Sequence, residues 1–203
     1  MAGIQLTLSN IMRLASLLAP ILLVFFFVML SILNQDFKGL VYVAGVLLAT
    51  ALNIPLMNMQ KSLASPDASL TCNLVEFPYL TNYNSPALSS LIIAFTFAYL
   101  YLPMRANNQM NYAVVASIIS LFAMDAVTKI SGKCTTVAGT VLGCLVGILF
   151  GVCWYTIFHA AGADYLLYFD ELDSNNVVCS KPSKQTFKCS VYKNGQLISS
   201  SIA

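Results

Sequence analysis

Five long apolar runs occupy most of the chain, and each is about as long as a lipid bilayer is thick. A helix needs about 20 residues to cross roughly 30 Å of hydrocarbon. Only 9% of the 203 residues are charged and 58% are apolar, whereas about one quarter of a soluble domain is charged. The sequence therefore predicts an all-α, multi-pass integral membrane protein with about five transmembrane helices, at residues 14–33, 39–57, 87–104, 112–130 and 137–158.

The composition changes near residue 164, where a polar segment replaces the apolar runs. Residues 1–163 are therefore predicted to form the transmembrane domain, and residues 164–203 a small polar tail. Within the tail, residues 186–192 alternate apolar and polar side chains, as a strand with two different faces does. Asn194-Gly195 follows, and this dipeptide is the strongest short signal for a hairpin turn. We expect a β-hairpin in the tail.

The third apolar run is preceded by Ser85-Pro86. Serine is a favoured N-cap residue, and proline is favoured at the first position of a helix because its missing N–H has no helical partner there. This pair predicts a helix that Ser85 caps and that continues from Ala87.

Basic residues near the membrane give a weak signal for orientation, because cytoplasmic loops carry an excess of Lys and Arg. The side on which the chain begins carries Arg13, Lys61 and Lys133, with Lys129 at the end of the fourth run. The other side carries Lys38 and Arg105. The bias favours an N-terminus inside and a C-terminus outside.

The cysteines offer a disulfide in the tail. Cys179 and Cys189 lie on adjacent predicted strands, so that a bond between them could staple a segment too small for a hydrophobic core. Two reduced thiols in a cytosolic tail are the alternative. The other four cysteines have no spacing typical of metal ligands, and no metal site is predicted.

The fifth run carries a glycine at every fourth position: Gly139, Gly143, Gly147 and Gly151. This spacing places all four on one helix face, where the absence of side chains lets another backbone approach closely. We expect this glycine zipper to pack tightly against a helix, either within the chain or in a second copy of it. Self-association through the glycine face is thus one of two readings.

Asp125 lies inside the fourth run, with Lys129 four residues later on the same helix face. An ionisable residue in a membrane helix is by default a candidate proton relay or ion ligand. A structural ion pair is the favoured alternative, because residues four apart on a helix can pair with each other. Asn53, beside Pro55, could likewise line a pathway or satisfy a broken helix.

The sequence contains few residues that could form a catalytic site. His159 is the only histidine, which excludes any site that needs two imidazoles, and no zinc-protease, nucleophile-elbow or P-loop motif is present. The sequence predicts no enzyme, no catalytic residue and no cofactor. A net charge of +2 without basic runs also argues against a nucleic-acid partner.

One segment, residues 85–151, is distantly similar to the membrane phosphatidic-acid phosphatase (PAP2) superfamily. The residues Ser85-Pro86-Ala87-Leu88-Ser89-Ser90 resemble its Pro-Ser-Gly-His-Ser element, and Thr128-Lys129 followed by Gly139 to Gly143 resembles its last motif. At the positions of the family's first histidine and its arginine stand Ser89 and Lys129. The resemblance therefore implies a site without catalytic activity.

The general character of the chain gives a second resemblance. A short multi-span protein with a small tail and no catalytic motif resembles the membrane-embedded minor capsid proteins of large icosahedral DNA viruses of the chlorella-virus type. That resemblance implies a structural protein of a virion's inner membrane, whose tail binds other proteins of a capsid layer above the bilayer. The leading hypothesis is such a non-enzymatic anchor; a transporter or channel subunit using Asp125 is the alternative.

Overall fold

The computed structural model describes residues 8–60, 72, 85–169, 188–193 and 196–202. The chain divides into two units, residues 1–172 and 173–203. Within the described part of the first unit, every long element is an α-helix: α1 (Leu8–Asn34), α2 (Lys38–Gln60), α3 (Leu88–Ala106), α4 (Tyr112–Ser131) and α5 (Val137–Ala160). All five are long and apolar enough to cross a membrane. The predicted fold class is confirmed.

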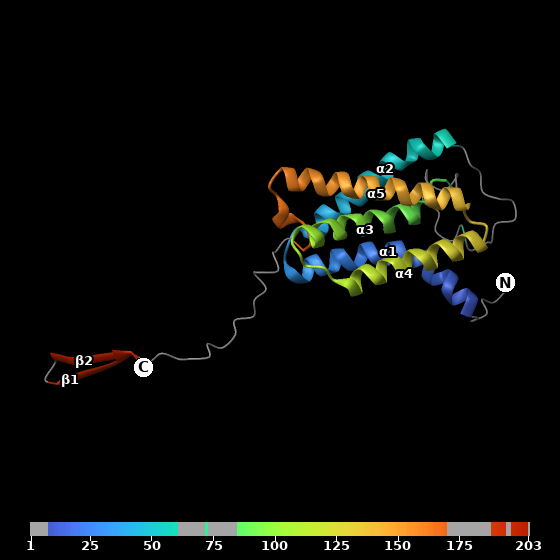
Figure 1. Cartoon of the computed structure of the whole chain (residues 1–203). Coiled ribbons are helices and arrows are strands. Elements are labelled where there is room, and N and C mark those ends of the chain that lie inside the picture. The colour runs from blue at the N-terminus through green and yellow to red at the C-terminus, as the bar shows by residue number, and fades with distance from the viewer. Residues whose placement is uncertain (1–7, 61–71, 73–84, 170–187, 194–195, 203) are drawn as a thin grey trace. The chain divides into compact units, whose positions relative to one another are not determined.

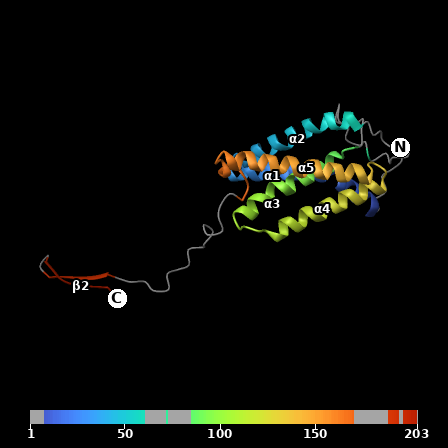
Figure 2. The same cartoon turned by 45° about the horizontal axis from the view of Figure 1, so that its top comes forward.

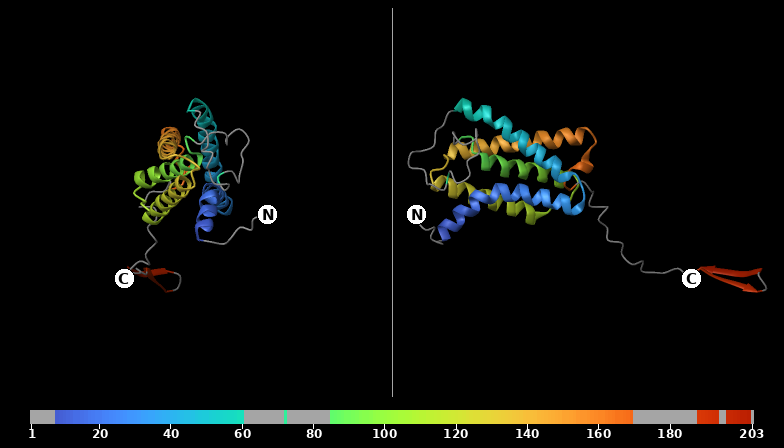
Figure 3. Two further views of the ribbon diagram at one scale, coloured as in Figure 1. Left: turned by 90° about the vertical axis from the view of Figure 1, so that its right-hand side faces the viewer. Right: turned by 180° about the vertical axis from the view of Figure 1, so that it is seen from behind.

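The five helices form one bundle, and successive helices run in opposite directions (Figure 1). Helix α3 contacts each of the other four helices. Figure 2 shows α3 lying between α4 and α5, and the end-on view in Figure 3 places α1 and α2 together beside these three. Because α3 and α5 are separated by one intervening helix, they run parallel to each other.

The central position of α3 follows from its composition. It has the lowest mean hydropathy of the five helices, 1.3, and the largest buried share, 67%. The polar residues Ser89, Ser90 and Thr96 lie on it and are buried. Thr96 donates its hydroxyl proton to the Ile92 carbonyl, and the Tyr42 hydroxyl of α2 lies 2.7 Å from Thr96 Oγ1. Protein partners thus replace the water that a bilayer lacks.

The glycine zipper of α5 packs against the backbone of α3. Gly143, Gly147 and Gly151 are buried. A Cβ atom at any of them would overlap a backbone carbonyl oxygen, that of Ala87, the N-cap of α3, or those of Leu91 and Phe95 within α3. The two glycines at the centre of this row leave no room even for a methyl group. The zipper is therefore occupied within the chain, which removes it as a surface for a second copy.

The start of α3 differs from the sequence prediction. The helix begins at Leu88, its N-cap is Ala87, and no side chain caps it. The Ser85–Pro86 peptide bond is cis, and the Ser85 hydroxyl donates to Gln60 Oε1 at 2.7 Å. The Ala87 N–H donates to the Gly139 carbonyl at 2.9 Å. The capping prediction was wrong because contacts with α2 and α5 engage the groups that local capping would use.

After α5 the chain folds back onto the bundle through the short 3₁₀ helix η2 (Asp164–Leu166). Leu167 is fully buried and Tyr168 is 6% exposed. The Tyr168 hydroxyl donates to the Phe27 carbonyl at 2.7 Å, and Asn107 Nδ2 donates to the Phe169 carbonyl at 2.6 Å. Burial raises the pKa of Tyr168 to about 12, so its hydroxyl keeps the proton that it donates. These residues belong to the bundle, although the sequence placed the tail from residue 164.

In the second unit, β1 (Lys188–Lys193) and β2 (Gln196–Ile202) pair as an antiparallel two-stranded sheet. Lys188 is opposite Ile202, and Lys193 is opposite Gln196. The two strands lie where the sequence predicts a hairpin. Residues 194–195, the predicted turn, lie outside the described residues.

We predict that Gly147→Val separates α3 from α5 and lowers the stability of the bundle. Overpacking a closely packed site costs about 1–3 kcal/mol, and the Leu91 carbonyl at this position belongs to the backbone and cannot rotate away. The matched control is Leu145→Val, on the exposed side of the same helix. Thermal unfolding in detergent should show a lower midpoint for Gly147→Val alone; equal midpoints would refute the tight contact.

Candidate functional site

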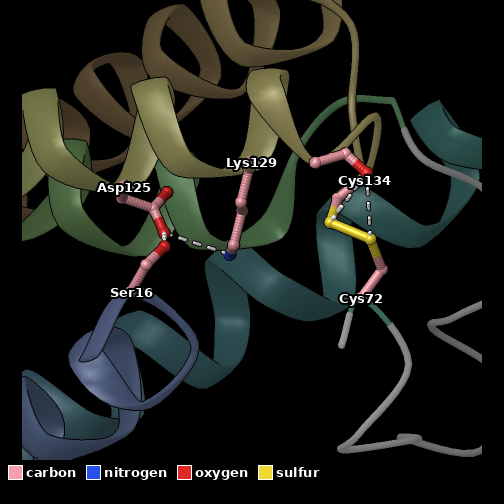
Figure 4. The surroundings of a disulfide bond; sticks show 6 residues. Ser16, Cys72, Asp125, Lys129 and Cys134 are labelled. Atoms are coloured by element: carbon pink, nitrogen blue, oxygen red, sulfur yellow. Dashed lines mark hydrogen bonds and ion pairs between the residues drawn. A yellow bond between two sulfur atoms is a disulfide. The ribbon is translucent and has the colours of Figure 1, made fainter. Parts of the chain in front are cut away.

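Asp125 is the centre of the most polar cluster inside the bundle. It lies on α4 and is fully buried. Lys129, one turn further along α4, places its Nζ atom 3.1 Å from Asp125 Oδ1 (Figure 4). The Lys129 side chain is one-fifth exposed, so the cluster lies near one end of the bundle rather than at its middle. The two residues that the sequence paired therefore form an ion pair in the structure.

Two serines from other helices complete the cluster. Ser16 of α1 donates its hydroxyl to Asp125 Oδ1 at 2.9 Å, and Ser89 of α3 donates to Oδ2 at 2.7 Å. Each carboxylate oxygen thus has a partner, and three helices converge on one side chain. Ser16 was not predicted as a site residue from the sequence, and Ser89 was named there only as the residue at the position of the PAP2 family's first histidine. Both serines lie in the first turn of a predicted span, and Asp125 lies late in a span that runs in the opposite direction. These positions place the three side chains near the same end of the bundle, and that signal could have found the cluster.

This arrangement favours charge neutralisation over chemistry. A buried carboxylate is stable when it is paired and hydrogen-bonded, and all three partners of Asp125 belong to the chain. Among the described residues, no group of three or more histidine, cysteine, aspartate or glutamate side chains could hold a metal ion. A crevice of about 170 Å³ lies between α3, α4 and α5, but its lining is wholly apolar and includes none of the cluster residues.

Asn53 of α2 is a second buried polar group. It is fully buried, and its Nδ2 atom lies 3.5 Å from the Pro86 carbonyl, at the entry to α3. Among the residues that the structure describes, its Oδ1 atom has no hydrogen-bond partner. The contact lies between α2 and the segment before α3, which fits the structural reading of Asn53.

A disulfide lies beside the ionic cluster (Figure 4). It joins Cys72, in the connection between α2 and α3, to Cys134, in the turn between α4 and α5, with Cα atoms 5.4 Å apart. The Cys134 N–H donates to the Lys129 carbonyl at 2.9 Å, which ties the bridge to the cluster. This pairing was not predicted from the sequence. The number of spans between them places both at the same membrane face, and that signal could have found the pair.

The other predicted site residues do not join this cluster. Cys179 and the side chain of Cys189 lie outside the described residues, so their pairing stays a prediction. His159 lies at the opposite end of the bundle, where its Nδ1 is 2.9 Å from Asp164 Oδ1, and both side chains are exposed. Its ring stacks on Tyr155 with centroids 5.3 Å apart.

Comparisons with protein-family models, with curated proteins and with solved structures find no match to the chain.

We predict that Asp125→Asn destabilises the bundle strongly. Removing one partner of a buried pair costs about 3–5 kcal/mol, because the remaining charge is left without compensation. Asp164→Asn is the control, since it breaks the exposed pair with His159, and exposed pairs contribute roughly 0–1 kcal/mol. Thermal unfolding in detergent should separate the two variants. Adding Lys129→Met to Asp125→Asn should recover part of the loss; no recovery would contradict the pairing.

Proposed function

We propose that this chain is a non-enzymatic structural membrane protein that anchors a protein assembly to a bilayer through its C-terminal tail. The finer suggestion, that the assembly is a viral capsid layer over a virion's inner membrane, rests on the resemblance to membrane-embedded minor capsid proteins. The observation that carries the anchoring role is the attachment of residues 164–169 to the bundle.

This attachment fixes the segment that leads into the tail to the bundle. Leu167 and Tyr168 are buried, and hydrogen bonds reach this segment from both sides, to the carbonyl of Phe27 in α1 and from Asn107 after α3. The rings of Phe27 and Tyr168 also lie 5.1 Å apart. A force on the tail would therefore act on α1 and α3 as well as on the end of α5.

The ionic cluster supports the same role. A relay or ion path needs a carboxylate that can exchange partners, whereas both oxygens of Asp125 are occupied by groups of the chain. The glycine zipper joins α5 to α3, and the ionic cluster joins α1 and α3 to α4. The polar and close-packed features of the bundle thus favour a rigid anchor.

We predict that a chain ending at Leu172 inserts and folds normally but no longer joins its assembly. Residues 164–169 must be retained, because a deletion from Asp164 would also remove buried Leu167 and the hydrogen bond of Tyr168. The readout is the fraction of chain that co-sediments with the assembly after the bilayer is dissolved in detergent. Full-length chain should sediment and the shortened chain should not.

The control for this experiment is the unfolding midpoint of the shortened chain, which should equal that of the full-length protein in detergent. Equal midpoints with lost sedimentation support anchoring through the tail. Normal sedimentation of the shortened chain overturns the proposal.

Transport through Asp125 is the second candidate, because a buried ionisable residue in a membrane helix is the usual mark of an ion path. It predicts proton or cation flux into sealed proteoliposomes that Asp125→Asn abolishes. If the cluster is closed to ions, a dye that reports the flux should instead give the same signal for the wild type, for Asp125→Asn and for protein-free liposomes. Flux that depends on Asp125 would replace the anchoring proposal with a transport function.

A further inference from the structure

The Cys72–Cys134 disulfide distinguishes one end of the bundle from the other. Cys72 lies in the connection between α2 and α3, and Cys134 lies in the turn between α4 and α5. Figure 1 places the start of α1, the end of α2, the start of α3 and the α4–α5 turn at this same end. The bond closes a loop with a sequence separation of 62 residues and so holds two connections together on one membrane face.

Disulfide bonds persist in oxidising compartments, whereas cysteine thiols in the cytosol are kept reduced. We infer that the end of the bundle carrying Cys72–Cys134 faces the oxidising side of its membrane, and that the C-terminal tail therefore enters the reducing compartment on the opposite side. This orientation reverses the one favoured by the basic residues.

The number of spans fixes the position of the tail. Five crossings separate the start of α1 from the end of α5, so the chain leaves the bundle at the end opposite the disulfide. Phe169 is held there by Asn107, which follows α3. Residues 170–203 contain no apolar run long enough to cross the bilayer again. The tail thus stays on the face that the chain reaches after α5.

The balance of basic residues does not oppose this orientation strongly. Lys129 is paired with Asp125 inside the bundle, so it does not act as a loop charge. The disulfide face then carries Arg13, Lys61 and Lys133, and the other face carries Lys38 and Arg105. A difference of one basic residue is a weak determinant of membrane orientation. A disulfide between two loops, in contrast, requires an oxidising environment in which to form.

Two consequences follow for the tail. Its thiols, Cys179 and Cys189, face a reducing compartment and remain unpaired there, which favours the second of the two readings of these residues. If the tail is the docking element of the proposed function, its partner is a protein of the cytosolic side. Only this last step rests on the proposed function; the orientation follows from the disulfide and the span count.

Glycosylation mapping tests the orientation directly, because the sequence contains no Asn-x-Ser/Thr acceptor with x other than proline. Val75→Thr creates Asn73-Leu-Thr between α2 and α3, and Gln196→Thr creates Asn194-Gly-Thr in the tail. Each full-length variant is translated into sealed microsomes. We expect an endoglycosidase-sensitive gel shift for Val75→Thr and none for Gln196→Thr. The opposite pattern overturns the orientation.

A second measurement covers the case in which neither acceptor is modified. A membrane-impermeant maleimide added outside intact microsomes should label Cys179 and Cys189 of the wild-type chain without detergent, and Cys179→Ser/Cys189→Ser should remove that signal. Labelling that needs detergent overturns the inference. So does peptide mapping that finds Cys72 and Cys134 reduced in cells. Loss of sedimentation by the chain ending at Leu172 bears on anchoring alone, so the two proposals can fail separately.

Discussion

The contact between the backbones of α3 and α5 is the interaction on which the rest of the bundle depends. In a bilayer, apolar side chains gain nothing from leaving lipid for protein, so helices associate through close packing and hydrogen bonds. The glycine row from Gly139 to Gly151 provides the close packing. Once α5 covers one side of α3, the remaining sides of α3 are available for α1, α2 and α4, and its buried serines and threonine are shielded from lipid.

Much of this architecture could be predicted from the sequence, because the bilayer imposes a simple rule on length and polarity. The second run, predicted at residues 39–57, is α2 (Lys38–Gln60), and the fifth, predicted at 137–158, is α5 (Val137–Ala160). The glycine face could also be recognised, because a period of four residues needs no knowledge of the partner. Its partner was not predicted, although Ala94 and Ala98, four residues apart on α3, face Gly147 and Gly151 and give a small-residue pair of the same spacing.

The errors and omissions arose where residues distant in sequence determine the local structure. Ser85 has the chemistry of an N-cap, but its hydroxyl is bound to Gln60. Ser16 looks like an ordinary small residue of an apolar helix until Asp125, 109 positions away, faces it. Cys72 and Cys134 have no local signal at all. In each case the partner is supplied by a different helix or connection, and only the arrangement of the spans brings the two groups together.

Hydrogen bonds near the two ends of the bundle supply the specificity that apolar contact lacks. At the disulfide end, Asp125 binds serines from α1 and α3; at the opposite end, Tyr168 and Asn107 fix the chain that follows α5. Between these ends the contacts are mainly close-packed or aromatic, and several alternative registers of apolar helices would have similar energies in lipid. The Asp125–Lys129 pair lies within α4 and survives any shift between helices, but only one register brings Ser16 of α1 and Ser89 of α3 to the Asp125 carboxylate. A shift would take these hydrogen bonds from a buried carboxylate, which costs free energy. The serine hydrogen bonds of the cluster therefore fix how α1 and α3 lie against α4, while the glycine contact fixes α5 against α3.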